Sequence, residues 1–317
     1  MTGLDLVPAE SREKILALMK ERILLLAPDE TVELTEDALN LAAMTKDGVR
    51  FFFNPGDVLP VVYGVVAVTV PYKQAAGCLA VEVTDTMLAN AEPEYVYVRT
   101  VDYTRPMVAL TFDDGPSENT GKILDILAKY DARATFCVTG NQIEMFPKVL
   151  QREVAEGHEI ATHTVGHKNL VKLNENNVQK QIMNVVTTVR DMTGYEIRFL
   201  RPPYGNVNST VRKVCRNNGL IIATWELDSK DWANRSRSKI ISNIKSQVTN
   251  GTIILCHDLY DFTAEAMETV IPWLIDQGYQ LVTLTELFQY HKDFSSGAMT
   301  GVVYSHLNVD NLVSPLQ

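Results

Sequence analysis

The sequence lacks a stretch that could cross a membrane, and it has too little positive charge for a protein that binds polyanions. Its longest apolar run, Val58–Tyr72, is interrupted by Pro60, Gly64 and Thr69, so it is too short and too broken to span a bilayer. The chain has 29 Lys and Arg against 39 Asp and Glu, which gives a net charge of −10. Nucleic acids and anionic membrane surfaces require a basic face. The charge therefore argues against both as partners and leaves neutral or cationic substrates open.

The sequence also lacks a visible leader and any closely spaced cysteine pair. Its first ten residues contain neither a basic segment nor an apolar core, so no secretory signal is apparent. We expect either a cytoplasmic protein or one whose leader or anchor has been removed. The four cysteines include no C-x-x-C spacing, so a cysteine zinc site is not expected. Cys137 and Cys256 lie in apolar runs and are predicted to be buried thiols.

The pattern of apolar residues predicts alternating strands and helices from residue 105 onward. At 317 residues, with 46% hydrophobic content, the chain can form one large domain and a small one. Strands are predicted over Val108–Phe112, Ala134–Val138, His158–Thr162, Arg198–Arg201, Leu220–Leu227, Thr252–Cys256 and Tyr279–Thr283. Helices are predicted over Lys122–Tyr130, Pro147–Glu156, Glu175–Met192 and Ala264–Gln277. This alternation indicates a parallel β/α architecture, either a barrel or a doubly wound sheet.

The region before residue 105 has a different character. Ser11–Leu26 has the periodicity of an amphipathic helix. Asp47-Gly48 and Pro55-Gly56 are typical of turns, and Val61–Val70 reads as a strand. We therefore predict a small α+β accessory domain over 1–104, a β/α barrel over 105–294 and a C-terminal tail over 295–317.

The polar residues that could perform chemistry fall at the carboxyl ends of the predicted strands. Along the chain they are Asp113 and Asp114 (first strand), His163 (third), Arg201–Tyr204 (fourth), Asp228–Trp232 (fifth) and His257 (sixth). Active sites of β/α barrels are assembled at this face from several strands at once. The pattern favours the barrel over a doubly wound sheet.

One carboxylate and two imidazoles in this set could hold a divalent metal. Asp114 follows the first strand, and His163 and His167 have the i, i+4 spacing of one helix face. A hydrolytic zinc site takes about three protein ligands and leaves a position for water, whose pKa the metal lowers to roughly 7. We predict a divalent metal cofactor, first of all Zn²⁺, with Co²⁺, Ni²⁺ or Mn²⁺ as alternatives.

Four further residues could supply a base and an acid. Asp113 can accept the proton of the water, and Arg201 would hold that carboxylate ionised and oriented. His257 can donate a proton to a leaving group when it is protonated, and Asp231 would favour its imidazolium form. A base and an acid on opposite sides of a metal-polarised carbonyl describe amide or ester hydrolysis.

Each segment also has a purely structural explanation when it is considered alone. Asp-Asp-Gly-Pro is a common turn sequence, and Arg201-Pro-Pro-Tyr204 could be a rigid strand exit. His257, Trp225 and Trp232 could all be core residues. The functional interpretation depends on five separate segments that meet at one rim.

In this order the segments resemble the five motifs of the polysaccharide deacetylases of carbohydrate esterase family four, whose catalytic module is shared with rhizobial chitooligosaccharide deacetylases. The segments are Thr111-Phe-Asp-Asp-Gly-Pro116, His163-Thr-Val-Gly-His167, Arg201-Pro-Pro-Tyr204, Asp228-Ser-Lys-Asp231-Trp232 and Leu255-Cys-His257. The resemblance runs from about residue 105 to 290 and implies a distorted seven-stranded β/α barrel.

The resemblance also implies a role for each residue. The catalytic residues would be Asp113 as base, His257 as acid, Arg201 positioning the base, Asp231 tuning the acid and Tyr204, whose backbone N–H helps to hold the oxyanion. The metal ligands would be Asp114, His163 and His167. Trp232 and Leu255 would wall the pocket for the acetyl methyl group, with Pro203 as a third substrate-binding residue.

We therefore expect a metal-dependent hydrolase that removes N-acetyl groups from a glycan containing N-acetylglucosamine, such as peptidoglycan or a chitin-like polymer. Two alternatives stay open: an O-acetyl esterase that acts on a xylan-type polysaccharide, and a catalytically silent glycan-binding or sensory protein. An amine needs a proton to depart, so an intact acid at His257 favours the amide. Members of this family act on extracellular glycans, so the resemblance implies an exported or cell-surface protein whose partner is the acetylated glycan.

Overall fold

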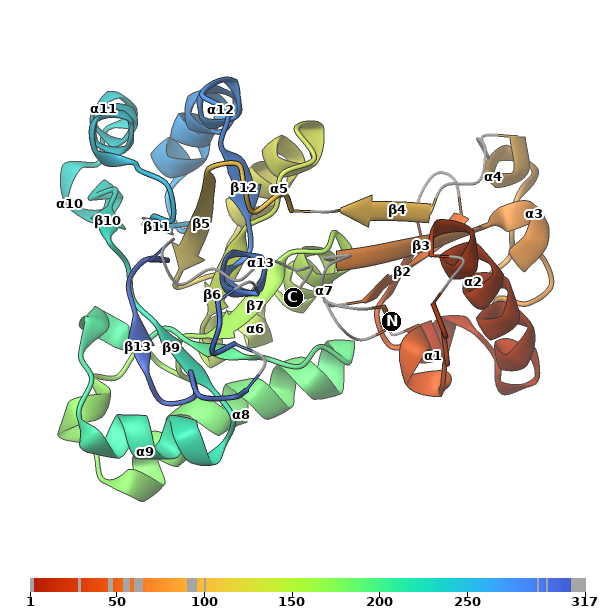
Figure 1. Cartoon of the computed structure of the whole chain (residues 1–317), viewed down its shortest axis with the longest axis horizontal. Coiled ribbons are helices and arrows are strands. Elements are labelled where there is room, and N and C mark those ends of the chain that lie inside the picture. The colour runs from red at the N-terminus through yellow and green to blue at the C-terminus, as the bar shows by residue number, and fades with distance from the viewer. Residues whose placement is uncertain are drawn as a thin grey trace. The chain divides into compact units, whose positions relative to one another are not determined.

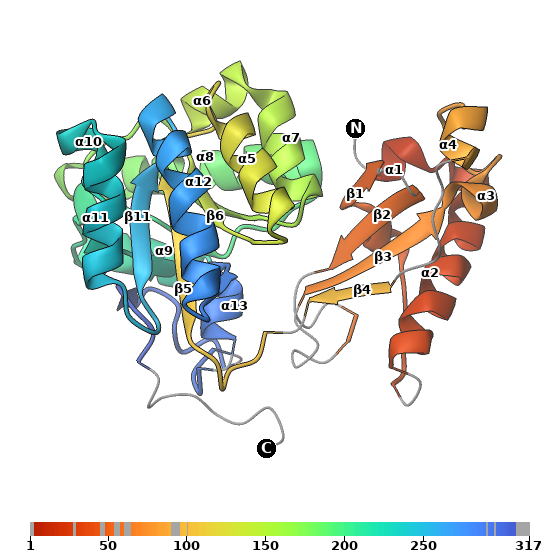
Figure 2. The same cartoon turned by 90° about the horizontal axis from the view of Figure 1, so that it is seen from above.

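The computed structural model describes residues 3–27, 30–44, 48–53, 58–59, 65–89, 96–99, 101–289, 291–294 and 296–308. The chain divides into two compact units (Figures 1 and 2). The N-terminal unit comprises Met1–Val101 with the short segments Ala155–Gly157 and Asp191–Tyr195, and the C-terminal unit comprises the rest.

The N-terminal unit is a small α+β fold, as predicted. Its four strands pair in the order β1-β2-β3-β4, and every pair is antiparallel. The elements are α1 (Gly3–Leu6), α2 (Arg12–Leu26), β1 (Ala42–Met44), β2 (Gly48–Phe53), β3 (Val65–Pro71), α3 (Tyr72–Ala75), α4 (Asp85–Ala89) and β4 (Val96–Arg99). Strand β3 is the described part of the predicted strand Val61–Val70. Residues 47, 55 and 56 of the predicted turns lie outside the described residues.

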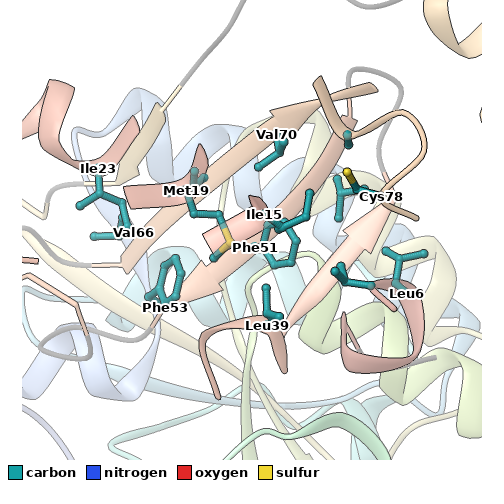
Figure 3. Close-up of a cluster of buried hydrophobic side chains, with 14 of the residues drawn as sticks. Leu6, Ile15, Met19, Ile23, Leu39, Phe51, Phe53, Val66, Val70 and Cys78 are labelled. Atoms are coloured by element: carbon teal, nitrogen blue, oxygen red, sulfur yellow. The ribbon is translucent and has the colours of Figure 1, made fainter. Parts of the chain in front are cut away.

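Helix α2 packs against β3 through one apolar stripe. Ile15, Met19 and Ile23 follow at intervals of four residues, which places them on one helix face, and all three are fully buried. Figure 3 shows these side chains clustered with Phe51 and Phe53 of the sheet. Burial of one such side chain contributes roughly 1.5–3 kcal/mol, so the N-terminal unit has a hydrophobic core of its own.

The C-terminal unit is built on a sheet whose strand pairs are all parallel. The order is β10-β11-β5-β6-β7-β8-β9-β13, and β12 pairs with β5 beside this path. The strands are β5 (Met107–Asp113), β6 (Thr135–Val138), β7 (Glu159–Thr162), β8 (Phe199–Leu200), β9 (Ile221–Ala223), β10 (Leu227–Asp228), β11 (Ile253–His257), β12 (Gln280–Val282) and β13 (Val303–Tyr304). Cys137 and Cys256 are free, buried thiols in this sheet, as predicted.

The predicted β/α barrel is confirmed, but the single predicted strand Leu220–Leu227 is wrong. In the structure it forms two strands: β9 pairs with β8, and β10 pairs with β11 at the other end of the sheet. Only three residues, 224–226, separate the two strands, and a chain of that length reaches about 14 Å at most. The two ends of the sheet must therefore approach each other, which curls the sheet into a barrel. The run is mostly apolar, with only Thr224 and Glu226 as polar residues, so the sequence does not show where the chain crosses this gap.

Helices cover the outside of the sheet. Helix α12 (Asp261–Asp276) packs against α5 (Thr120–Lys129) and α11 (Arg237–Gln247), and Figure 2 shows these three beside β5 and β11. The remaining helices are α6 (Gly140–Met145), α7 (Pro147–Ala155), α8 (Glu175–Thr193), α9 (Ser209–Asn217), α10 (Asp231–Asn234) and α13 (Leu284–Phe288). The four predicted helices are confirmed. Helix α9 was not predicted because it buries only three residues and is otherwise polar.

The described part of the predicted C-terminal tail lies in the sheet. Strand β13 pairs with β9, and an isolated bridge joins His306 to Thr252. Met299 and Leu307 are buried. Apolar side chains in this segment thus add to the core of the C-terminal unit.

Candidate active site

A pocket of about 400 Å³ opens at the carboxyl ends of the barrel strands. Asp113 ends β5, and His257 ends β11 in register beside it. His163 directly follows β7, and Arg201 directly follows β8. The pocket is lined by Asp113, Asp114, His163, His167, Tyr204, Trp225, Asp228, Trp232, Leu255 and His257. The structure thus brings side chains from all five motif segments to one place.

The ligand atoms of Asp114, His163 and His167 lie within 4.8 Å of one another. Asp114 Oδ1 lies 3.4 Å from Nε2 of His163 and 3.6 Å from Nε2 of His167. This oxygen is buried and accepts no hydrogen bond within the described part of the chain. A buried, unpaired carboxylate oxygen is costly unless a cation is bound to it. The donor set therefore fits a divalent metal.

The protein fixes the orientation of the first histidine through its other ring nitrogen. His163 Nδ1 lies 2.7 Å from the carbonyl oxygen of Arg201, so Nδ1 carries the proton and Nε2 faces Asp114 with a free lone pair. Burial and the neighbouring His163 together lower the pKa of His167, which favours its neutral, ligating form. The expected helical spacing of the pair is wrong. The two histidines span a turn with positive φ at Thr164 and His167.

Arg201 is fully buried behind Asp113. Its Nη1 donates to Asp113 Oδ1 at 2.9 Å, its Nε donates to the carbonyl oxygen of Ala223 at 2.7 Å, and its Nη2 donates to the Thr111 hydroxyl at 3.2 Å. The three bonds orient the guanidinium plane, which in turn orients the carboxylate. Thr111 was not identified as a site residue. Its position inside a strand does not reveal from the sequence that its hydroxyl meets the Arg201 guanidinium.

Asp231 is fully buried, and its carboxylate accepts four hydrogen bonds. Oδ1 accepts from the Trp232 N–H at 2.8 Å and from His257 Nδ1 at 2.7 Å. Oδ2 accepts from the His257 backbone N–H at 2.7 Å and from the Thr263 hydroxyl at 3.0 Å. Burial alone would lower the pKa of His257, but the hydrogen bond and charge of Asp231, with help from the other aspartates, raise this pKa to about 9. Thr263, which the sequence did not reveal, lies in the first turn of α12.

Two exposed aromatic side chains stand at the mouth of the pocket. Tyr204 is 62% exposed, and its ring meets that of His167 edge-on at 4.7 Å between centroids. Trp232 is 52% exposed, and its Nε1 donates to Asp228 Oδ2 at 3.3 Å. Most large apolar side chains in a folded protein are buried, so exposed aromatic rings beside a pocket are informative. Such rings are suited to contact a bound ligand.

Leu255 and Trp225 also line the pocket, whereas Pro203 is buried and is not among the lining residues. Trp225 lies on the segment that crosses from β9 to β10, and the Arg201 guanidinium carbon stands 5.6 Å from the centre of its ring. The closeness of this aromatic ring to the site follows from the way the barrel closes. It is therefore a feature of the tertiary structure that the periodicity of the sequence does not show.

The backbone around the first motif is held in a sparsely populated conformation. Asp114 has a φ of 75°, which costs free energy for a residue with a side chain. The next residue, Gly115, passes so close to the buried Asp258 that a Cβ atom there would overlap the carboxylate. Burial raises the pKa of Asp258 to about 7. A glycine therefore follows the two aspartates because no larger residue fits between them and Asp258.

Comparisons with known proteins identify the family of this chain. The family model described as Polysaccharide deacetylase matches residues 100–223. The Peptidoglycan-N-acetylmuramic acid deacetylase PdaC of Bacillus subtilis is 38% identical over 194 residues, which cover 61% of this chain and 41% of that protein. A Peptidoglycan-N-acetylglucosamine deacetylase of Bacillus cereus is 36% identical over 205 residues, 63% of this chain and 74% of that protein. The chain belongs to the polysaccharide deacetylase family.

Solved structures of this deacetylase family share the fold. PdaC from Bacillus subtilis superimposes with a TM-score of 0.57 at 37% identity and covers 60% of this chain and 93% of the solved one. A family 4 acetyl xylan esterase from Clostridium thermocellum, solved in complex with a cobalt ion, gives a TM-score of 0.57 at 30% identity, with 63% and 98% covered. The match spans about two fifths of the length of PdaC itself.

A second family model, described only as a protein of unknown function (DUF3298), matches residues 10–73 in the N-terminal unit. Among the described helices, none combines the length and the apolar character that a membrane span requires.

Proposed function

We propose that this chain is a metal-dependent N-deacetylase of a glycan that contains N-acetylglucosamine, and that it acts on cell-wall peptidoglycan outside the cell. The observation that carries the proposal is the arrangement of three groups in one pocket. A triad that fits a metal shares the pocket with a carboxylate held by a buried arginine and an imidazole held by a buried aspartate. Relatives named as peptidoglycan deacetylases support the choice of substrate.

Asp114, His163 and His167 would hold the metal, with Zn²⁺ as the first candidate and Co²⁺, Ni²⁺ or Mn²⁺ as alternatives. The cobalt ion in the solved relative supports a divalent ion at such a site. When bound, the ion would lower the pKa of a water ligand to roughly 7 and polarise the acetyl carbonyl.

Asp113 would remove the proton from the attacking water. Its Oδ2 lies 3.9 Å from His163 Nε2, on the same side as the ligand atoms, while Oδ1 is occupied by Arg201. One oxygen is therefore held in place and the other faces the reaction. The guanidinium fixes the orientation of the carboxylate, which suits it to act as a base.

His257 would protonate the departing amine. Its Nδ1–H is bonded to Asp231, so Nε2 is the atom left to face the pocket. With a pKa near 9 it is protonated at neutral pH. An amine is a poor leaving group without a proton, and the positively charged imidazole supplies that proton.

The remaining residues of the site would bind the substrate. Trp232 and Leu255 would flank the acetyl methyl group, because both line the pocket and present apolar surface. The Tyr204 backbone N–H would help to hold the oxyanion, and Pro203 would keep that backbone in place from its buried position.

Acetate release from a panel of glycans tests the proposal. The panel would contain peptidoglycan, chitin oligomers and acetylated xylan, each incubated with protein that is intact, chelated, or chelated and reloaded with Zn²⁺. We expect release from the N-acetylated glycans, loss of activity on chelation without loss of helical circular dichroism, and recovery with Zn²⁺. Activity on xylan alone would establish the O-acetyl esterase instead, for which the solved esterase is a precedent. No release from any glycan would favour a catalytically silent glycan-binding protein.

A further inference from the structure

A stacked aromatic pair lies beside the pocket on the side of His257. Tyr260 and Phe262 follow β11, with ring centroids 5.0 Å apart and planes inclined by 11°. The ring centroid of Tyr260 lies 6.3 Å from that of His257. Both residues are half-buried, so part of each ring faces solvent. Neither lines the pocket itself, so the pair lies outside the pocket, next to a residue of its wall.

A cationic residue, Arg235, directly follows α10. The Arg235 backbone N–H donates to the carbonyl oxygen of Asp231 at 3.1 Å. Asp231 is also bonded to Thr263, in the first turn of α12. Two residues further on, Arg237 donates to the carbonyl oxygen of Glu265 at 3.1 Å, two residues along the same helix from Thr263. Anchored at both ends, this segment lies along the N-terminal half of α12, the end that Tyr260 caps.

The charge of Arg235 is available to a ligand. The residue is exposed, and across the described residues its guanidinium forms no ion pair and donates no hydrogen bond. Burial raises the pKa of Tyr260, and the charge of Arg235 opposes that rise, which agrees with their proximity. The neighbouring Asp261 is occupied by Lys122 at 2.5 Å. This unpaired cation contrasts with the net charge of −10 of the whole chain.

We propose that Arg235, Tyr260 and Phe262 form a binding subsite for a sugar ring that carries a carboxylate, next to the ring that loses its acetyl group. The aromatic pair would contact the apolar face of the sugar, and Arg235 would bind the carboxylate through its fork of N–H donors. This inference rests on the proposed function and narrows its substrate. An N-acetylmuramic acid unit carries such a carboxylate where no stem peptide is attached to its lactyl group, whereas chitin oligomers carry none.

A matched pair of glycans tests the subsite. One is a peptide-free oligosaccharide of alternating N-acetylglucosamine and N-acetylmuramic acid, and the other is the same oligosaccharide with its carboxylates converted to N-methylamides. Kinetics of acetate release would be measured on both for the parent, Arg235→Gln, Arg235→Lys and Tyr260→Leu. Arg216→Gln serves as control, because it removes the same charge from an exposed position on α9.

Arg235→Gln should raise KM for the carboxylate glycan about three- to tenfold relative to the amide, the range for an exposed charge-assisted contact. Arg235→Lys should restore most of the difference, and added salt should raise KM for the carboxylate glycan in the parent. Tyr260→Leu should raise KM for both glycans, since stacking does not depend on the charge. Arg216→Gln should match the parent on both.

Equal KM changes on the two glycans for Arg235→Gln, or no change on either, would overturn the subsite while the deacetylase function stood. If the parent released no acetate from any glycan, the proposed function would fail. Dissociation constants of the two glycans, measured by calorimetry on the same variants, would then decide the subsite alone. A parent that bound the carboxylate and amide forms equally tightly would overturn it.

Discussion

The bond between His257 and Asp231 predicts how the rate of amide hydrolysis depends on pH. Asp231→Asn removes the charge that holds the proton on the imidazole and keeps the shape of the side chain. His257 has its pKa raised to about 9 mainly through this partner, while its burial acts in the opposite direction. Without the aspartate charge we expect the pKa to fall to about 6.5 or below, the value of an isolated imidazole.

The size of the effect follows from the fraction of protonated His257. At about pH 8, a group with a pKa near 9 is about 90% protonated, and one with a pKa near 6.5 is about 3% protonated. The variant should therefore lose about thirtyfold in the rate of amide hydrolysis at that pH. At about pH 5.5 both forms are largely protonated, and the loss from this cause should be less than about twofold. His257 can donate a proton only below its pKa. The alkaline limb of the kcat–pH profile should therefore move to lower pH in Asp231→Asn.

The assay is kcat against pH, with the metal saturating, on an N-acetylglucosamine oligomer and on an aryl acetate. An aryloxide departs without a proton, so the ester should lose far less than the amide at every pH. The control is Asp125→Asn, which makes the same chemical change on α5. Asp125 forms an exposed ion pair with Arg152 of α7. A loss that is independent of pH and equal on both substrates would show that Asp231 only maintains the fold and does not tune a proton donor.

Three further changes test other parts of the site. Asp113→Asn should lower the rate by about 10²–10⁴ and leave the metal content unchanged by elemental analysis; an empty site would mean that Asp113 is a ligand. Thr263→Val removes one hydrogen-bond donor to Asp231. It should slow amide hydrolysis more than ester hydrolysis, and Thr263→Ser should restore the rate. Equal slowing of both reactions would count against a role of Thr263 in positioning Asp231. Gly115→Ala should lower the midpoint of thermal unfolding, since its Cβ would overlap Asp258; an unchanged midpoint would refute the close approach.

Much of this protein could be predicted from local patterns in the sequence. The buried strand β5 and helices such as α8 follow from apolar periodicity, which depends only on neighbouring residues. Asp113 and His257 could be placed at one rim without any coordinates, because the carboxyl ends of parallel strands meet at the same face. The order and spacing of the motifs along the chain also showed the family resemblance. Each motif follows a particular strand, so the base, the metal ligands and the acid occur in the order of the strands.

Other features were decided only by the tertiary structure, because they depend on residues far apart in the chain. The run Leu220–Leu227 divides into β9 and β10 because the sheet curls until its ends are within reach of three residues. That closure brings Trp225 into the pocket. Thr263 reaches Asp231 across 32 positions, and the segment after α10, which carries Arg235, is anchored to α12 by Arg237. Periodicity gives the face on which a side chain lies, whereas the partner it meets there depends on how the whole barrel packs.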